Sequence, residues 1–498
     1  MVTTDGKSDR PGSPHVPGRH LDPSSIVATF IVAQLVFWTA LPAISHSAPP
    51  LDVVESLVWG REWLLGTHKH PPLPSWLLEA GRLLTGSVIW MPFLLSQICV
   101  GLTLLFVFLL GRRMFDARAA AMGTLLLGGL FYFSWPTPEF NHNVVQMPIW
   151  AGVALFLHRA ERQGDWLSWI MLALLGALAI YSKFSAALML LFVPLWLLLN
   201  ADGRAHLKTA GPWVALVVFI VLVAPEALWL IRNDFLPLEW ASLRAGGGGT
   251  PATFLLAQVA DHLPMLIVAG AAGLIGRGML RPMGTGKDRK FLLLMGFGPL
   301  ILTVVVAVFM GGGLKDMWGA PMFSLSGLIV VAFFGGRLKD AGLKRGLASV
   351  LVLIVLVSSV YAVLVAQGPH WFGLKPMRGA WPGATIQQAA EAHFEAETGQ
   401  PMKYVIGDFW LGGLATITAR HDPSLLMNGD PRLSPWIDLD DMKKSGALII
   451  WQIREGKPAP GHDIFGPVTA DRQLVLPWKD RERPPLLIGM QVLPPQGE

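Results

Sequence analysis

Long apolar runs recur along almost the whole chain, and they constrain its fold more than any other feature. About eleven of these runs approach the roughly 20 residues that a helix needs to span a bilayer, at residues 25–44, 87–110, 119–135, 144–158, 166–181, 184–200, 211–231, 258–276, 291–310, 319–335 and 346–366. Charged residues make up only 15% of the 498 positions, against about 25% in typical soluble proteins. The sequence therefore predicts a polytopic α-helical membrane protein with about 11 transmembrane helices.

Lys and Arg are distributed unequally between the two alternating sets of loops. One set holds most of the basic clusters: Arg112, Arg113 and Arg118; Arg159 and Arg162; Arg204 and Lys208; Arg277, Arg281, Lys287, Arg289 and Lys290; and Arg337, Lys339, Lys344 and Arg345. Cytoplasmic loops carry such an excess of positive charge. The bias predicts a cytoplasmic N-terminus and places everything after residue 366 on the outer side of the membrane.

The two ends of the chain differ in composition from the apolar middle, residues 25–366. Residues 1–24 are polar and rich in Pro, Gly and Ser, which predicts a disordered cytoplasmic tail; they lack the pattern of a cleaved signal peptide, so the first apolar run is expected to stay as an anchor. Residues 367–498 contain short β-like pieces ("KYVIGDFW", "GALIIWQI", "RQLVLPW") and a helix-like "TIQQAAEAHFEAETG". This part predicts a small soluble α+β domain on the outer face.

Composition and motifs exclude several classes of site. A single cysteine, Cys99, allows neither an intramolecular disulfide nor a cysteine-based metal site. The chain has no Walker or dinucleotide-binding motif. Its net charge of +5 is scattered among short loops, so we expect no nucleic-acid partner. Twenty Trp against four Tyr fit aromatic belts at the two interfaces of a lipid bilayer.

The first outer loop, residues 45–86, contains the first candidate acids. Asp52 and Glu55 share a face if the segment is helical, and one of them could act as a general base; from spacing alone, a solvated pair or a helix cap is the more common reading. The segment "VVESLVWGREWLL" has helical periodicity, with Trp59 and Trp63 on one side. It predicts an amphipathic helix lying in the membrane interface.

The stretch "THKHPPLPSW" follows in the same loop. Its Pro-Pro pair stiffens the chain and would hold Lys69 and His70 where a cation or imidazole can stabilise a phosphate. Alternatively, Lys69 reaches the lipid headgroups and the histidines are solvated. Two ligands do not make a metal site, so His68 and His70 alone do not predict one.

A second polar turn, "SWPTPEFNHN", follows the third apolar run. Four hydrogen-bonding side chains crowd between prolines beside the bilayer: Glu139, Asn141, His142 and Asn143. Such a density of polar groups at a membrane indicates a functional site, against the alternative of an exposed turn with proline stops.

Two lysines complete the candidate set. Lys183 lies between two apolar runs, where it either binds a phosphate or sugar carboxylate or extends toward the headgroups. Lys315 and Trp318 in "GGGLKDMWGAP" suit binding of a lipid phosphate and stacking on a sugar, against the reading of Trp318 as an interfacial anchor.

Together these motifs resemble the GT-C type glycosyltransferases that use polyprenol-phosphate sugars, in particular family 39, which includes protein mannosyltransferases and the aminoarabinose transferase acting on lipid A. The resemblance rests on the acidic first outer loop, "HPPL" (residues 70–73), the polar turn and "YSKFSAALML". More narrowly, "LDVVESLVWGREWLLG", "PEFNHNVVQMPIW" and "GDPRLSPW" look like the bacterial transferases that move galacturonic acid onto lipopolysaccharide core or lipid A. The resemblance to these families extends from about residue 50 onward and weakens toward the C-terminus.

The resemblance implies an inverting transfer of a hexuronic acid, aminopentose or hexose at the periplasmic face of the bacterial inner membrane. The donor would be a polyprenyl-phosphate sugar, and the acceptor lipopolysaccharide, lipid A or another envelope glycan. Asp52 would be the general base, His70 with Lys69 would contact the phosphate, and Lys183 would face the donor. No cofactor is implied, and a divalent metal remains open.

The chain departs from the family pattern at two positions. The usual Asp-Glu pair reads Asp52-Val53, with Glu55 displaced as an accessory group. No second aspartate follows the third apolar run, so Glu139 or Asn143 would hold its place.

Three alternatives remain from the sequence: a transporter or flippase for lipid-linked sugars, an enzyme like the protein O-mannosyltransferases, and an inactive paralogue. Transporters keep charges or broken helices near the bilayer midplane. Glu226 beside Pro225 is such a feature, whereas the other polar clusters gather at one face and favour an enzyme.

Overall fold

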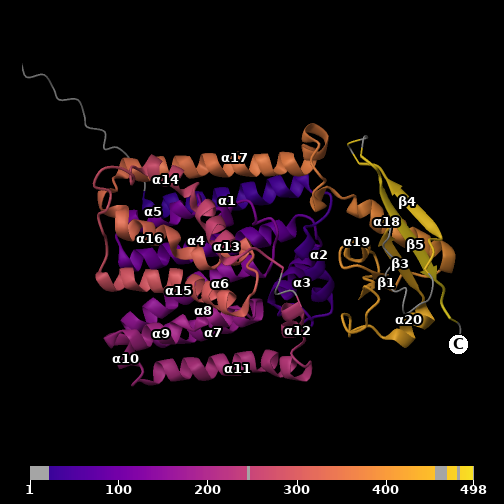
Figure 1. Ribbon diagram of the computed structural model, residues 1–498, viewed down its shortest axis with the longest axis horizontal. Helices are drawn as coiled ribbons and strands as arrows, with labels where there is room; N and C mark the ends of the chain where they lie inside the picture. The colour runs from indigo at the N-terminus through magenta and orange to yellow at the C-terminus, as the bar shows by residue number, and fades with distance from the viewer. Residues whose placement is uncertain (1–21, 244–246, 455–467, 479, 481–482, 497–498) are drawn as a thin grey trace, which may run out of the picture.

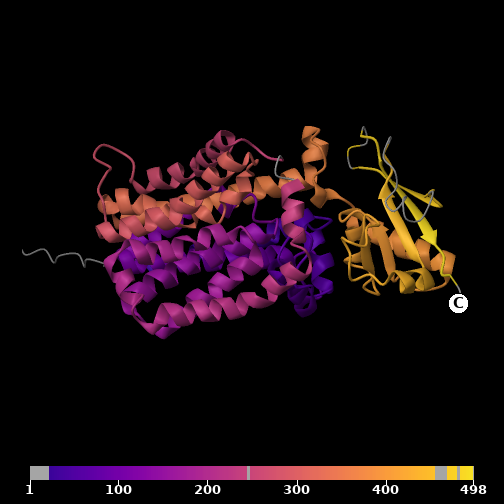
Figure 2. The same ribbon diagram turned by 60° about the horizontal axis from the view of Figure 1, so that its bottom comes forward.

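The protein is elongated, with a helical bundle at one end and a mixed sheet at the other (Figures 1 and 2). The computed structural model describes residues 22–243, 247–454, 468–478, 480 and 483–496. The predicted tail therefore lies outside the described residues up to position 21, and Pro23 already begins the first helix. Two short helices, α2 (Leu51–Arg61) and α3 (Leu73–Thr85), lie between the bundle and the sheet. We call this end of the bundle the sheet end.

Six helical segments among the described residues are long and apolar enough to cross a membrane. They are α1 (Pro23–Ser45), α4 (Met91–Met114), α11 (Ala210–Arg232), α13 (Pro251–His262) continuing into α14 (Met265–Ala272), α15 (Gly286–Met310) and α17 (Asp340–Phe372). The remaining bundle helices are α5 (Ala117–Leu127), α6 (His142–Gln163), α7 (Trp166–Ser182), α8 (Ala186–Leu190), α9 (Phe192–Leu199), α10 (Ala201–His206), α12 (Leu236–Leu243) and α16 (Ser326–Phe334), with short 3₁₀ turns η1 (Phe131–Phe133), η2 (Asp316–Gly319), η3 (Met322–Leu325) and η4 (Gly335–Arg337). A membrane bundle is observed, but the count of eleven spanning helices is not confirmed.

The difference in count arises where apolar runs do not stay helical. The run 119–135 is helical only to Leu127, because the chain then turns through η1 and reaches Pro136. The run 184–200 divides into α8 and α9, and the run 319–335 divides into η3 and α16. A high hydropathy indicates that a segment is buried in an apolar medium. A broken helix inside a bundle can have the same hydropathy as a continuous spanning helix.

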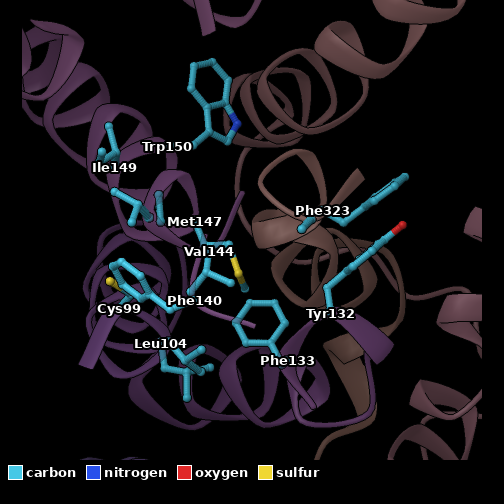
Figure 3. Close-up of a cluster of buried hydrophobic side chains, with 14 of the residues drawn as sticks. Cys99, Leu104, Tyr132, Phe133, Phe140, Val144, Met147, Ile149, Trp150 and Phe323 are labelled. Carbon is cyan, nitrogen blue, oxygen red and sulfur yellow. The ribbon is translucent and has the colours of Figure 1, made fainter. Parts of the chain in front are cut away.

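The centre of the bundle is packed around α4 and α6. Phe140, Val144 and Met147 at the start of α6 are buried against Cys99 of α4 and Phe133 of η1 (Figure 3). Burial of such large side chains stabilises a fold by about 1.5–3 kcal/mol each. This core fixes the first turn of α6, which carries three of the candidate site residues.

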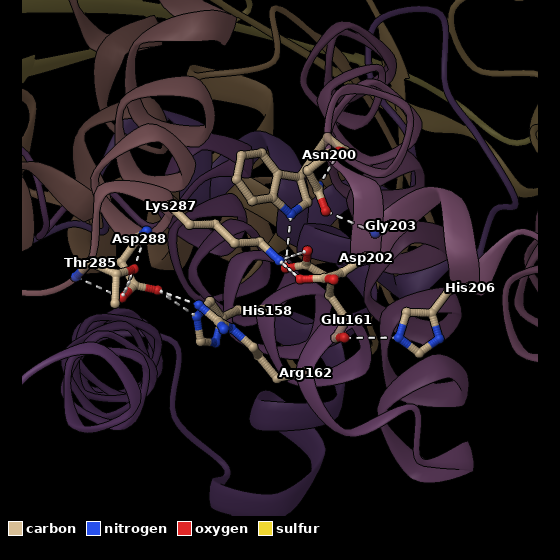
Figure 4. A network of polar contacts seen from close by, with 11 residues as sticks. His158, Glu161, Arg162, Asn200, Asp202, Gly203, His206, Thr285, Lys287 and Asp288 are labelled. Atoms are coloured by element: carbon tan, nitrogen blue, oxygen red, sulfur yellow. Dashed lines mark hydrogen bonds and ion pairs between the residues drawn. The ribbon is translucent and has the colours of Figure 1, made fainter.

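Polar contacts hold the other end of α6 (Figure 4), where α10 lies away from the sheet (Figure 1). Asp288 at the start of α15 accepts from Arg162 at 3.1 Å and lies 3.3 Å from His158. Lys287 pairs with Glu161 and, at 2.5 Å, with Asp202. The network ties α6 to α10 and α15, so both ends of α6 are fixed.

Helix α2 is buried nearly all round. Residues from Val53 to Gly60 are buried between α3 and the C-terminal part. The expectation of an amphipathic helix in the membrane interface is therefore wrong. The helix ends at Arg61, so Trp63 lies beyond it with a φ of 46° and is exposed, whereas Trp59 is buried.

The C-terminal part contains a five-stranded sheet in the order β2-β1-β3-β5-β4. The strands are β1 (Tyr404–Gly407), β2 (Ser424–Met427), β3 (Ala447–Gln452), β4 (Arg472–Leu476) and β5 (Leu486–Leu493), with β1 parallel to β2 and β3, and β5 antiparallel to β3 and β4. Helices α18 (Gly383–Thr398), α19 (Leu411–Thr416) and α20 (Leu439–Ser445) and the turn η5 (Arg378–Ala380) complete it. The three strands and the helix expected from sequence are observed; β2 and β5 are additional.

Candidate active site

Two carboxylates from distant parts of the sequence meet at the sheet end. Asp52 is the second residue of α2, and its backbone N–H donates a hydrogen bond to Oε1 of Glu139 at 2.7 Å. Nδ2 of Asn141 donates to Oδ2 of Asp52 at 3.0 Å. One carboxylate thus receives the free N–H of a helix start, a favourable place for negative charge, while the other is oriented by an amide.

Buried polar side chains of α1 and α4 hold the loop that carries Glu139. Nε2 of Gln97 donates to Oγ1 of Thr137 at 2.9 Å, and Ser96 donates to the Thr137 carbonyl. Nε2 of Gln34 donates to the carbonyl of Phe133 at 2.7 Å. Because buried polar groups of α1 and α4 are satisfied only with the loop in this position, it is fixed relative to the bundle.

Burial raises the pKa of Glu139 to about 7, and the nearby charge of Asp52 adds to this effect. The Asp52 N–H bond and the positive charge of Arg378 act in the opposite direction. A carboxyl with this pKa changes its protonation state near neutral pH, which is typical of groups at functional sites.

Three consecutive residues at the start of α6 join the parts of the site. Asn141 contacts Asp52, as described; the ring of His142 lies 4.1 Å from that of His70, between centroids; and Oδ1 of Asn143 accepts from Nζ of Lys183 at 2.8 Å. The Asn141 side chain also caps the helix through the N–H of Asn143 at 2.9 Å. The first turn of α6 therefore places the acid pair next to the basic residues.

Lys183 follows α7 and lies against an aromatic ring. Its Nζ atom is 5.2 Å from the ring centre of Trp318, within the range of a cation–π contact. Burial lowers the pKa of Lys183 to about 7, with a further contribution from the positive charge of Lys315. The structure thus brings together Lys183, Lys315 and Trp318, which the sequence offered as separate candidates.

His70 is held in a tight turn. Oγ1 of Thr67 accepts from the backbone N–H groups of Lys69 at 3.2 Å and His70 at 3.0 Å. Burial, followed by the charges of Lys69 and Lys183, lowers the pKa of His70 well below its usual value. The imidazole is therefore neutral at physiological pH and offers one N–H donor rather than a charge.

Lys69 has a carboxylate partner within the protein. Its Nζ atom lies 2.6 Å from Oε2 of Glu55, which is buried. The same Nζ is 5.5 Å from the ring centre of Trp240 in α12 and 5.9 Å from that of Phe409 in the C-terminal part. Glu55 therefore does not share the place of Asp52 but neutralises Lys69.

Several residues near the site were not indicated by the sequence. Trp240 and Phe409 contact Lys69, and Arg378 acts on Glu139. The stretch "GDFW" predicted only a strand, because its composition does not indicate that an aromatic residue in it contacts the first outer loop. Glu226 is fully buried in α11, and neither of its carboxyl oxygens has a hydrogen-bond partner in the described structure.

No group of three or more His, Cys, Asp and Glu side chains within the described ranges is arranged to hold a metal ion.

A cavity of about 350 Å³ opens beside Lys315. It is lined by Gly248, Gly249, Thr253, Phe254, Ala257, Leu314, Lys315, Asp316 and Met317.

The chain has detectable similarity to known proteins in sequence. Residues 69–229 match a family described as dolichyl-phosphate-mannose-protein mannosyltransferase. The lipopolysaccharide core galacturonosyltransferase RgtA of Rhizobium johnstonii is 24% identical over 460 residues, which cover 89% of this chain and 88% of RgtA.

Its fold is similar to that of solved structures of ArnT from Cupriavidus metallidurans. The structure bound to undecaprenyl phosphate superposes with a TM-score of 0.61 at 16% identity, over 94% of this chain and 98% of ArnT. The apo structure gives a TM-score of 0.58 at 15% identity, with the same coverage of both chains.

Proposed function

We propose that this chain, a membrane glycosyltransferase of the GT-C type, transfers a sugar from a polyprenyl-phosphate donor to lipopolysaccharide or another envelope glycan with inversion at the anomeric carbon. The observation that carries the proposal is the first turn of α6, which sets the pair Asp52–Glu139 beside Lys183 and His70. An acid–base group adjacent to a phosphate-binding group is what such a transfer requires.

In this mechanism, Asp52 is the general base. Its carboxylate accepts the proton of the acceptor hydroxyl, whose oxygen forms a bond to the anomeric carbon as the bond from that carbon to the phosphate oxygen breaks. Asn141 orients Asp52 through its 3.0 Å hydrogen bond. An ionised Glu139 adds a second negative charge beside Asp52 and so favours transfer of the acceptor proton into the acid pair.

The leaving polyprenyl phosphate is stabilised on the other side of α6. Lys183 and Lys315 supply positive charge and His70 supplies an N–H donor, which is the arrangement that stabilises a phosphate as its charge develops. Lys69 is partly neutralised by Glu55. Its role is therefore to shape the pocket and to attract the phosphate more weakly than Lys183 and Lys315 do.

The orientation in the membrane is part of the proposal. Arg118 pairs with Asp340 at the start of α17, and Arg162 belongs to the network of Figure 4 that joins α6 to α15. The start of α17 and helix α10 lie at the end of the bundle opposite the sheet (Figure 1). Basic loops are retained in the cytoplasm. The sheet end, with the site, then faces the periplasm, where lipopolysaccharide precursors are modified.

Among the three sugar classes, a hexuronic acid is favoured because RgtA is described as a galacturonosyltransferase. The test uses purified enzyme in vesicles with lipopolysaccharide or a peptide as acceptor and, in separate reactions, polyprenyl phosphate carrying galacturonic acid, aminoarabinose or mannose. Transfer from the first donor and loss of transfer in Asp52→Asn are expected. Transfer from the mannose donor to a peptide would favour the protein O-mannosyltransferase alternative, and an Asp52→Asn variant as active as the wild type would refute the mechanism.

A further inference from the structure

The connector between α17 and α18 is pinned to the loop that precedes Asp52. The carbonyl of Gly379 accepts from the backbone N–H groups of Ser47 at 2.7 Å and Ala48 at 3.3 Å. The ring of His46 lies directly against Gly379, leaving no room for a side chain at that position. The turn η5 is therefore held a few residues from the start of α2.

Arg378, the first residue of this turn, places an exposed cation at the acid pair. Its guanidinium lies over the ring of Trp410, 5.5 Å from the centre, and its charge acts on Glu139. Among the described residues, Arg378 has no ion pair. An arginine stacked on an aromatic ring presents its free edge in a fixed plane, which suits bidentate binding of a carboxylate or phosphate.

Trp410 packs in a group of three tryptophans beneath Arg378. Trp381 lies 5.7 Å from Trp410 and 5.8 Å from Trp478, between ring centres. The indole N–H of Trp410 has no acceptor in the described structure. The side chain of Asp408 fixes the backbone here, accepting from the N–H of Trp410 at 2.9 Å.

The position of Arg378 relative to the other cations indicates which substrate it meets. Lys183 bonds to Asn143, beside the adjacent rings of His70 and His142 where the leaving phosphate is proposed to lie. Arg378 instead precedes Gly379, which bonds to the loop leading into Asp52. In an inverting displacement the nucleophile approaches opposite the leaving group. A cation on the acid side therefore faces the acceptor.

We infer that Arg378, stacked on Trp410, binds an anionic group of the acceptor glycan, a phosphate or a sugar carboxylate, and so contributes to acceptor specificity. This inference rests on the proposed function, since it takes the acid pair as the place where the acceptor hydroxyl reacts. The C-terminal part then contributes directly to the substrate site, because Trp410 lies beneath Arg378 and the neighbouring Phe409 reaches Lys69.

The test measures KM for donor and acceptor separately in Arg378→Gln, Arg378→Lys and the matched control Arg472→Gln, which removes an exposed charge from the edge strand β4. The acceptors are lipopolysaccharide and the same material after chemical dephosphorylation. Arg378→Gln is expected to raise the acceptor KM about ten- to hundredfold, the range of one charge-assisted contact. Arg378→Lys is expected to give an intermediate acceptor KM, and the control Arg472→Gln is expected to keep the acceptor KM of the wild type.

The two acceptor preparations identify the anion. A defect confined to intact lipopolysaccharide indicates a phosphate, and a defect that persists after dephosphorylation indicates a sugar carboxylate. An unchanged acceptor KM in Arg378→Gln, or a rise in donor KM alone, would overturn the inference while wild-type transfer leaves the proposed function intact. Absence of transfer by the wild type with every donor would instead contradict the proposed function.

Discussion

The backbone N–H of Asp52 donates to Oε1 of Glu139 at 2.7 Å, so the first turn of α2 and the loop before α6 form one unit. The two residues are 87 positions apart in sequence. Their contact puts two carboxylates in one partly buried place, where the charge of Asp52 helps to raise the pKa of Glu139.

Substitution of Asp52 by Asn is expected to lower kcat about 10²- to 10⁴-fold, the contribution of a general base. The amide keeps the size of the side chain but cannot accept the proton. Initial rates of sugar transfer measure the effect, and Asp440→Asn at the exposed start of α20 is the control. A kcat within twofold of the wild type would remove Asp52 from the role of base.

Activity is expected to rise with pH through about 7, where Glu139 ionises. Below this pH the carboxyl of Glu139 is neutral, and its negative charge is absent from the acid pair. A pH profile of kcat for the wild type and Glu139→Gln measures the effect, and the variant should lose the inflection near pH 7. An inflection of equal size in both proteins would assign it to another group.

The same carboxyl is expected to make stability decrease with pH. Its pKa in the folded protein, about 7, exceeds the ordinary value of 4.5, so the folded state binds more protons between these values. The stabilisation is present below about pH 4.5 and is lost as pH rises through 7. Tm in detergent should fall less steeply over this range in Glu139→Gln, and parallel curves for the two proteins would argue against the shift.

Lys183 is expected to bind polyprenyl phosphate better at pH 6 than at pH 8, since its pKa of about 7 leaves it neutral at the higher pH. A bound phosphate stabilises the charged form of Lys183 and therefore raises the pKa of this lysine. Binding of undecaprenyl phosphate is measured by thermal shift. Lys183→Arg, which stays charged, should remove most of the pH dependence, and Lys183→Ala should weaken binding about tenfold or more. Equal pH dependence in the arginine variant would contradict this role.

Arg61 is expected to attach α2 to the C-terminal part. Its Nη atoms donate to the carbonyls of Thr416 at 2.8 Å and Ile417 at 2.6 Å, and it lies 3.1 Å from Asp422. Arg61→Ala should cost about 2–4 kcal/mol, because a buried fork of hydrogen bonds is lost and its acceptors are left unpaired. Chemical denaturation measures this, with the exposed Arg432→Ala as control; equal stability of the two variants would show that the attachment does not depend on Arg61.

The proposed orientation is testable by labelling. Cys99 is buried, so single cysteines at exposed positions can be introduced in a Cys99→Ser background. In spheroplasts, a membrane-impermeant maleimide should label Glu397→Cys in α18 and not Arg204→Cys in α10. The reverse pattern would place the sheet in the cytoplasm.

The sequence by itself determined the class of the protein and most of the residues of the candidate site. Apolar runs reveal helices in lipid because the bilayer demands long hydrophobic segments, and polar groups beside them are conspicuous. Asp52, Glu139, His70 and Lys183 could therefore be selected without coordinates, and the strands β1, β3 and β4 could be recognised from their β-like composition.

Only the tertiary structure decided which of these groups meet. Sequence spacing made Glu55 the neighbour of Asp52, but the fold pairs Glu55 with Lys69 and gives Asp52 the more distant Glu139. Hydropathy could not tell continuous spans from broken helices, since both are buried in an apolar medium. Arg378 and Trp410 carried no signal at all, because their importance comes from the docking of the C-terminal part onto α2. Contacts between segments far apart in the chain depend on packing, which no local pattern encodes.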